Sequence, residues 1–388
     1  MSVATAPAAA ARSNCAQGAV LTVDLHAVAA NTRFFAARTR AEVMAVVKAD
    51  GFGHGGAEAA RAALANGATR LGVTSIAEGL ALREAGLAAP VLSWLNPVDA
   101  DFGLALAASI DLAVPSLRHL SAVMGAARAS GRRARVHLHL DAGMARDGCE
   151  PAQWPGLCRA AFGGEQRGML HVVGLMGHLG CADVPADPCN ETGRARFAWG
   201  LETARAAGLR PVMRHLAATA AALTDPRTHH TLCRIGAGLV GIDPSRTTRL
   251  HPALTLTAPV VAVRRVRAGS PVGYGHSWAA PADTTLGLLP VGYADGLPRA
   301  ASGHAEVVVG GLRCPVAGLI SMDQTVIDLR SQQVDPGEIA TVFGPGTFGE
   351  PTVADWAGWA GTIEHEIVTG IGARVRRQVT GAGHQGAR

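Results

Sequence analysis

The stretch MAVVKADGFGHG, residues 44–55, decides how the rest of the chain is interpreted. Four residues with strand composition lead to Lys48, and three glycines follow it within seven residues. The glycines let the backbone turn tightly and approach a ligand closely. A lysine held among apolar neighbours loses its proton more easily, which suits Schiff-base chemistry. The alternative is an ordinary surface lysine at the end of a strand.

Around this stretch, runs with strand composition alternate with helical ones. We expect strands at residues 44–48, 70–75, 90–95, 111–116, 135–141, 172–179, 212–219 and 232–239. Eight strands alternating with helices indicate an α/β fold, a (β/α)₈ barrel. A doubly wound sheet is disfavoured because no GxGxxG motif follows the first strand. The mouth of the barrel, where the carboxyl ends of its strands meet, would gather Lys48, Asp141, Gly143, Arg146, His178, Thr219 and Gly236.

The composition indicates a folded protein in a reducing compartment. Of the 388 residues 48% are hydrophobic and 17% are charged, which is typical of globular chains. A net charge of +5 without a long basic run argues against nucleic-acid binding. Seven scattered cysteines without CxxC spacing predict free thiols, no metal site and a cytoplasmic location. Neither a secretory signal nor a membrane-spanning segment is expected.

The pattern changes near residue 250, where short strand-like runs separated by turns predict a mostly β second domain. We predict a flexible leader at 1–20, the barrel at 21–250, the mostly β domain at 251–378 and a loose tail at 379–388. The two tyrosines of the chain, Tyr274 and Tyr293, lie beside glycines in this second domain. A phenol near a cation can act as a base, whereas the alternative is packing with one hydrogen bond.

Eight different short motifs follow one another along the chain. They are AVVKADGFGHG (45–55), DAGMAR (141–146), HLAATA (215–220), RIGAGLVG (234–241), VGYG (272–275), VGYADG (291–296), SMDQT (321–325) and TIEHEI (362–367). Together these motifs resemble those of the alanine racemases over residues 21–377. The resemblance implies a racemase that interconverts L- and D-amino acids with pyridoxal 5'-phosphate. It also implies a homodimer with shared active sites.

The resemblance assigns roles to the matching residues. Lys48 would hold the cofactor covalently and act as one base, and Tyr274 of the partner subunit would act as the other. Racemisation needs two bases because the α-proton leaves one face of the substrate and returns to the other. The resemblance places His178, His215, Thr219, Arg234, Gly236, Ala237 and His365 at the cofactor. It places Arg146, Met322 and Asp323 at the substrate.

Several residues differ from those usual in the family. Phenylalanine and histidine replace two tyrosines at Phe52 and His365, and His139 stands where a lysine is usual. Other differences are Ala218, Thr219, Leu319 and Ser321. They cluster at the cofactor phosphate, the substrate carboxylate and the entry. We therefore expect a divergent member, with a racemase for another amino acid as one alternative. Further alternatives are aldol cleavage, decarboxylation or transamination of the same bound amino acid, and a cofactor-binding protein without turnover.

Overall fold

The computed structural model describes residues 18–381, which divide into two compact units. One unit is His26–His251, and the other combines the residues up to Leu25 with those from Pro252 onward. Most of the leader predicted at 1–20 and of the tail predicted at 379–388 lies outside the described residues. The predicted change of pattern near residue 250 therefore coincides with a boundary between the units.

The first unit is a parallel barrel, as the sequence predicts. Its strands are β2 (Glu42–Val46), β3 (Ala68–Val73), β4 (Val91–Ser93), β5 (Ile110–Val114), β6 (Ala134–His139), β7 (Leu170–Met176), β8 (Met213–His215) and β9 (Leu232–Ile235). They pair in the order β8-β7-β6-β5-β4-β3-β2-β9. The ring closes between β8 and β9, because the Arg234 N–H donates to the Ala217 carbonyl at 3.0 Å.

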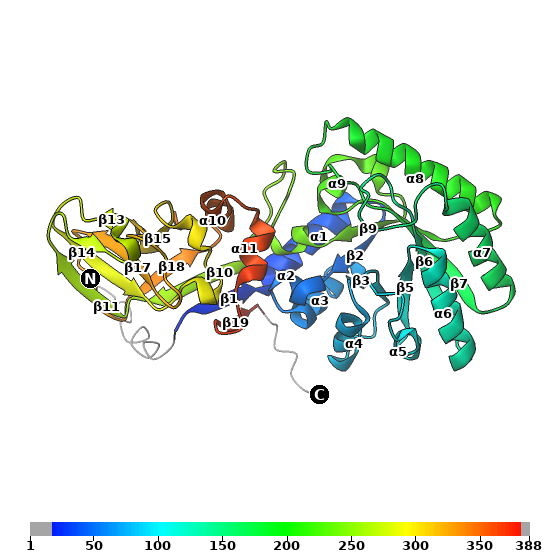
Figure 1. Ribbon diagram of the computed structural model, residues 1–388, viewed down its shortest axis with the longest axis horizontal. Coiled ribbons are helices and arrows are strands. Elements are labelled where there is room, and N and C mark those ends of the chain that lie inside the picture. Colours follow the sequence, from blue (N-terminus) through cyan, green and yellow to red (C-terminus); the bar gives the residue numbers. More distant parts are fainter. Residues whose placement is uncertain (1–17, 382–388) are drawn as a thin grey trace, which may run out of the picture. The chain divides into compact units, whose positions relative to one another are not determined.

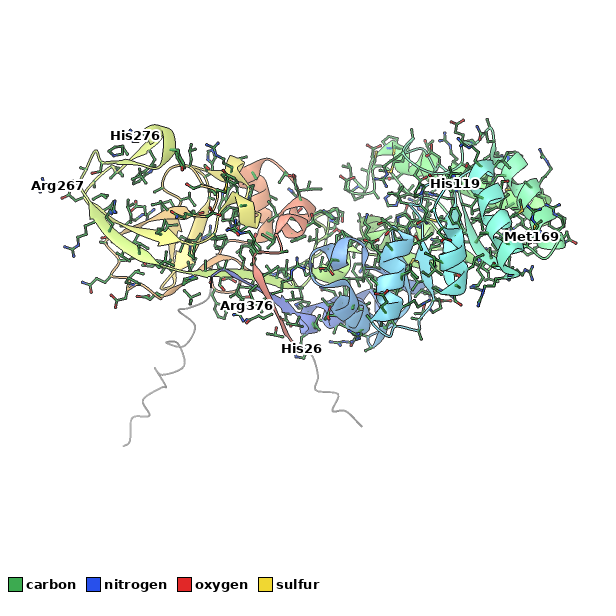
Figure 2. The ribbon with its side chains drawn as sticks, turned by 60° about the horizontal axis from the view of Figure 1, so that its bottom comes forward. His26, His119, Met169, Arg267, His276 and Arg376 are labelled. Atoms are coloured by element: carbon green, nitrogen blue, oxygen red, sulfur yellow. The ribbon has the colours of Figure 1, made fainter. Side chains whose placement is uncertain are left out.

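Helices surround these strands in Figure 1. They are α1 (Leu25–Arg38), α3 (Gly56–Leu64), α4 (Ile76–Glu84), α5 (Phe102–Ala107), α6 (Leu117–Ser130), α7 (Trp154–Gln166), α8 (Pro188–Ala206) and α9 (Thr219–Thr224). Local signals set their ends: Ser116 accepts from the His119 N–H to cap α6, and left-handed Gly131 ends it. Figure 2 marks His119, which follows β5, and Met169, which precedes β7. They mark the carboxyl and amino ends of the strands, and the carboxyl end carries the functional loops.

A left-handed turn follows the first barrel strand and carries Lys48 in short helix α2 (Lys48–Phe52). Ala49, Asp50, Gly51 and Phe52 have φ values of 51°, 52°, 63° and 56°. This conformation costs about 1–2 kcal/mol for each residue that carries a Cβ. Two carboxylates hold it: Asp50 accepts from the Gly56 N–H and Glu78 from the Ala49 N–H, both at 2.7 Å. Such strain concentrates at functional sites.

The second unit is mostly β, as predicted. One sheet has the order β16-β15-β18-β10-β1-β19, another β11-β14-β17, and β12 pairs with β13. The strands are β1 (Val20–Asp24), β10 (Leu254–Pro259), β11 (Ala262–Val266), β12 (Pro271–Val272), β13 (Trp278–Ala279), β14 (Thr284–Leu289), β15 (Glu306–Val309), β16 (Leu312–Pro315), β17 (Thr325–Arg330), β18 (Ile339–Phe343) and β19 (Arg376–Thr380). Helices α10 (Val353–Ala360) and α11 (Glu364–Gly370) complete it.

Two predicted domain limits are wrong. Strand β1 was expected to open the barrel domain at residue 21, but it lies between β10 and β19 in the six-stranded sheet. The tail was expected from residue 379, but β19 continues to Thr380 because it pairs in parallel with β1. The β unit is therefore assembled from both ends of the described chain. Within residues 18–381 no helix is long and apolar enough to cross a lipid bilayer.

Candidate active site

Lys48 lies at the carboxyl end of β2, as predicted, and is half-buried. Burial lowers the pKa of its amine, the positive charge of Arg146 lowers it further, and the carboxylate of Glu78 opposes both. Its Nζ lies 5.9 Å from the centre of the Phe52 ring. Lys48 is also the single lysine among 35 basic residues, a signal that the sequence reasoning missed by counting lysine and arginine together. One side-chain amine in this chain can form a Schiff base.

Arg234 lies in β9 and is buried inside the barrel. Its Nη1 donates to the Nδ1 and the carbonyl oxygen of His215, at 3.1 and 2.8 Å. Its Nη2 donates to the Gly177 carbonyl at 2.7 Å, to His178 Nδ1 at 3.1 Å and to the Leu216 carbonyl at 3.2 Å. Burial lowers its pKa to about 10, so the guanidinium remains charged at neutral pH. The structure confirms that Arg234, His215 and His178 come together.

A line of polar side chains extends from Arg234 through two histidines to a carboxylate. His215 Nε2 lies 2.8 Å from His137 Nδ1, and His137 Nε2 lies 3.6 Å from Asp111 Oδ2. An arginine can only donate, so His215 accepts at Nδ1 and donates from Nε2. His137 then accepts at Nδ1, and its Nε2–H faces the carboxylate. Arg135 pairs with the same carboxylate at 2.8 Å. The sequence did not single out His137 or Asp111. The one available signal was that His137 lies on a predicted strand, two residues before His139.

His178 lies half-buried at the centre of a positive cluster. Burial lowers its pKa to about 3, and the charges of Arg234, Arg146, His139 and Lys48 act in the same direction. His178 is therefore neutral and accepts a hydrogen bond from Arg234. These interactions show that Lys48, Arg146 and His178 are neighbours at the mouth of the barrel, as the topology predicted, and that Arg234 lies close to them.

Two glycine-rich segments meet where the sequence predicts a phosphate. The Thr219 hydroxyl, at the start of α9, accepts from the Gly238 N–H at 3.1 Å. Gly236 packs on the ring of Phe52, and a Cβ at this position would lie 2.8 Å from that ring. Ala237 begins a short 3₁₀ helix, η3 (Ala237–Val240). Hydroxyl and amide donors beside a turn of this kind can hold an anion.

Arg146 follows a loop that the carboxylate of Asp141 organises. Asp141 Oδ1 accepts from the backbone N–H groups of Gly143, Met144 and Ala145 at 2.8–3.2 Å. His139 does not contact Arg146 through a hydrogen bond or ion pair in the described residues, and its Nδ1 lies 3.4 Å from the carboxylate of Asp147. Burial opposes ionisation of Asp147, but its interaction with His139 and the hydrogen bond from the Gly148 N–H outweigh burial and lower the pKa. His139 therefore acts on the residue next to Arg146.

The β-unit motifs gather around neighbouring loops. The Tyr293 N–H donates to the Ser321 carbonyl at 3.0 Å, and a Cβ on Gly292 would lie 2.2 Å from that oxygen. Arg374 pairs with Asp323 at 2.7 Å, and Met322 is exposed beside it. Tyr274 begins the 3₁₀ turn η4 (Tyr274–His276), whose last residue is marked in Figure 2. His365 lies in α11. Contacts of these residues with the barrel site stay predictions.

Three histidines with lowered pKa values predict a steep loss of stability in mild acid. Burial lowers the pKa of His137, His178 and His215, whereas an unfolded histidine takes up a proton near pH 6.5. Below that pH the unfolded chain binds more protons, so the free energy of unfolding falls. Each histidine contributes a slope approaching about 1.4 kcal/mol per pH unit. Urea unfolding at pH 7.5, 6.5 and 5.5 measures this, and a constant free energy across that range would contradict it.

A parallel barrel whose mouth holds one lysine of lowered pKa and a buried, hydrogen-bonded arginine suits the class of enzymes that bind an aldehyde cofactor covalently. Residues 23–244 match the family model described as alanine racemase, N-terminal domain, and residues 253–379 match that of the C-terminal domain. Alanine racemase of Thermobifida fusca is 46% identical over 364 residues, 93% of this chain and 97% of that protein. The structure of alanine racemase from Streptomyces coelicolor A3(2) is 44% identical, with a TM-score of 0.93, covering 95% of this chain and 99% of that one.

The chain belongs to the alanine racemase family. It is an amino-acid racemase that uses pyridoxal 5'-phosphate. A third solved protein, alanine racemase from D-cycloserine-producing Streptomyces lavendulae, is 40% identical with a TM-score of 0.92, covering 94% of this chain and 97% of that one. Such identities over nearly the whole length mean that the chain is not markedly divergent, contrary to the expectation drawn from single positions.

Proposed function

We propose that this protein interconverts L- and D-alanine, with pyridoxal 5'-phosphate bound at Lys48. The observation that carries the proposal is the single lysine, whose amine has a lowered pKa, at the same barrel mouth as the hydrogen-bonded guanidinium of Arg234. The names of the relatives at 43–46% identity support alanine as the substrate. The residues present fit the cofactor, because they supply an amine, a buried cation and anion-binding donors.

The barrel residues would hold the cofactor from three sides. Lys48 forms the covalent link, Thr219, Gly236 and Ala237 bind the phosphate, and His178 packs near the ring. Pyridoxal phosphate withdraws electrons from the α-carbon of an attached amino acid and so makes its α-proton acidic. Arg234 can donate but not accept, so a pyridine nitrogen that faces it must be unprotonated. His215 supports the guanidinium by accepting its hydrogen bond.

Two bases are needed on opposite faces of the substrate, and we assign them to Lys48 and to Tyr274 of the partner subunit. The carboxylate of the substrate would meet Arg146, Met322 and Asp323, while His365 completes the cofactor site. Support for a partner comes from the β unit, where Tyr274 is 72% exposed and Met322 53% exposed. Apolar and aromatic side chains exposed together on motif-bearing loops suit an interface. We also propose a cytoplasmic location, supported by the free thiols of the six described cysteines.

Racemisation of a panel of amino acids tests the substrate. We expect L-alanine to give the highest kcat/KM, with L-serine and L-2-aminobutyrate at least about tenfold lower, because one extra heavy atom in a fitted pocket has effects of that size. Chiral chromatography of the products measures each rate. A bulkier amino acid with a higher kcat/KM than alanine would instead support the alternative that the replaced side chains at Phe52 and His365 suggested.

A further inference from the structure

A cluster of potential metal ligands lies outside the cofactor site, in the loop between β7 and α8. The Sγ atoms of Cys181 and Cys189 and a carboxylate oxygen of Asp187 all lie within 4.8 Å of one another. All three residues are half-buried. Cys181 comes three residues after His178, and Cys189 lies in the first turn of α8. The sequence predicted no metal site because the cysteines lack CxxC spacing; seven residues separate these two.

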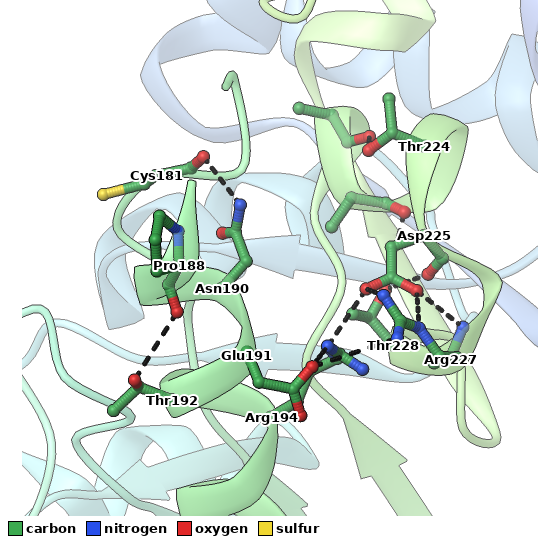
Figure 3. A network of polar contacts seen from close by, with 12 residues as sticks. Cys181, Pro188, Asn190, Glu191, Thr192, Arg194, Thr224, Asp225, Arg227 and Thr228 are labelled. Atoms are coloured by element: carbon green, nitrogen blue, oxygen red, sulfur yellow. Dashed lines mark hydrogen bonds and ion pairs between the residues drawn. The ribbon is translucent and has the colours of Figure 1, made fainter. Parts of the chain in front are cut away.

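Hydrogen bonds that do not involve the thiols hold this arrangement in place. Asp187 caps α8 by accepting from the Cys189 N–H at 2.8 Å. The amide of buried Asn190 donates to the carbonyls of Cys181 at 3.1 Å and Val184 at 3.0 Å, and Figure 3 shows the first of these contacts. An ion pair between Arg194 and Asp225, 3.1 Å long, also fixes α8 in this view. The three donors are therefore positioned before any ligand arrives.

The donor set suits a thiophilic divalent cation. Zinc bound tetrahedrally at about 2.3 Å separates two sulfurs by about 3.8 Å, which fits within the observed spacing. One carboxylate oxygen of Asp187 caps the helix, and the other keeps its lone pairs for a ligand.

We propose that Cys181, Asp187 and Cys189 bind one Zn²⁺ or a similar soft divalent cation, with water as the fourth ligand. Binding forms two metal–sulfur bonds and one metal–oxygen bond. The two thiols release their two protons to solvent, so two thiolates, one carboxylate and the cation carry a net charge of −1. The bound cation would link Cys181, in the loop after β7, to the start of α8. Cys181 lies three residues after His178 in the sequence. The proposal is independent of the reaction that the enzyme catalyses.

Cadmium is the probe for this site, because thiolate-to-cadmium charge transfer absorbs in the ultraviolet. The full-length holoenzyme, reduced with a phosphine, is titrated with Cd²⁺ alone. We expect one equivalent per chain to produce the band and to protect Cys181 and Cys189 from alkylation, located by mass spectrometry. Cys181→Ser and Cys189→Ser should each lose the band. Asp187→Asn retains a capping residue and should weaken binding by at least about tenfold.

Cys314→Ser is the matched control, since it removes a described thiol in β16 that does not belong to the cluster and should leave the band unchanged. Circular dichroism and cofactor absorbance of each variant check that it is folded. Absence of a stoichiometric band in the wild type would overturn the proposal. So would a band that persists in both cluster variants, or one that disappears in Cys314→Ser.

Discussion

Replacing Lys48 by alanine is expected to abolish covalent cofactor binding and to lower racemase activity by at least about 10⁴-fold. The variant loses both a base, which alone contributes about 10²–10⁴-fold, and the attachment point of the cofactor. Because Lys48 is the single lysine, no neighbouring side chain can replace its amine. Borohydride reduction followed by peptide mass spectrometry should place the cofactor on residues 44–55 in the wild type and nowhere in Lys48→Ala.

Lys48→Arg is the matched control, because it retains the positive charge beside Glu78 but cannot form a Schiff base. Equal loss in both variants assigns the effect to the amine, whereas activity in Lys48→Arg would assign it to charge. A reduced cofactor adduct elsewhere in the Lys48→Ala chain would show that the attachment site is wrong.

Tyr274→Phe is expected to reduce racemisation by about 10²–10⁴-fold while cofactor absorbance stays unchanged. The variant removes one hydroxyl from an exposed turn and leaves the barrel untouched. Tyr293→Phe is the matched control, because it removes the other phenol of the chain, 19 residues away, and should retain nearly full activity. Comparable activity in Tyr274→Phe and the wild type would exclude Tyr274 as a base.

Mixing the two inactive variants tests whether the bases come from different subunits. In a heterodimer of Lys48→Ala and Tyr274→Phe chains, one site carries both substitutions and the other carries neither. Unfolding and refolding the mixture should therefore restore activity if Tyr274 serves the partner's site. If both bases came from one chain, each site in the mixture would carry one substitution and activity would stay absent.

The barrel could be predicted because its signals are local. Each strand is a short run of β-forming residues. Helices have residues at their ends that start and stop them, such as Ser116 and Gly131 for α6. Strand β1 could not be assigned in the same way, because its neighbours β10 and β19 lie more than 200 residues away. A five-residue strand at the start of a chain carries no mark of the sheet that it joins.

The candidate site was predictable where residue type determines chemistry and unpredictable where spatial contacts do. The motifs identified Lys48 and Arg234. The roles of His137 and Asp111 became visible only in the barrel, where side chains from β5, β6 and β8 meet. The partner of His139 also required the structure, since Asp147 approaches it through a loop. Replacements at single positions suggested a divergent member of the family. The sequence identity of 46% to a relative over 93% of the chain outweighs that suggestion.

Incubating the purified enzyme with L-alanine in deuterium oxide tests the central claim most directly. We predict that D-alanine accumulates until the two enantiomers are equal, with deuterium at the α-carbon and the carbon skeleton intact, as measured by chiral chromatography and mass spectrometry. Release of carbon dioxide, an aldehyde or a keto acid in place of D-alanine would contradict the account, as would D-alanine without deuterium.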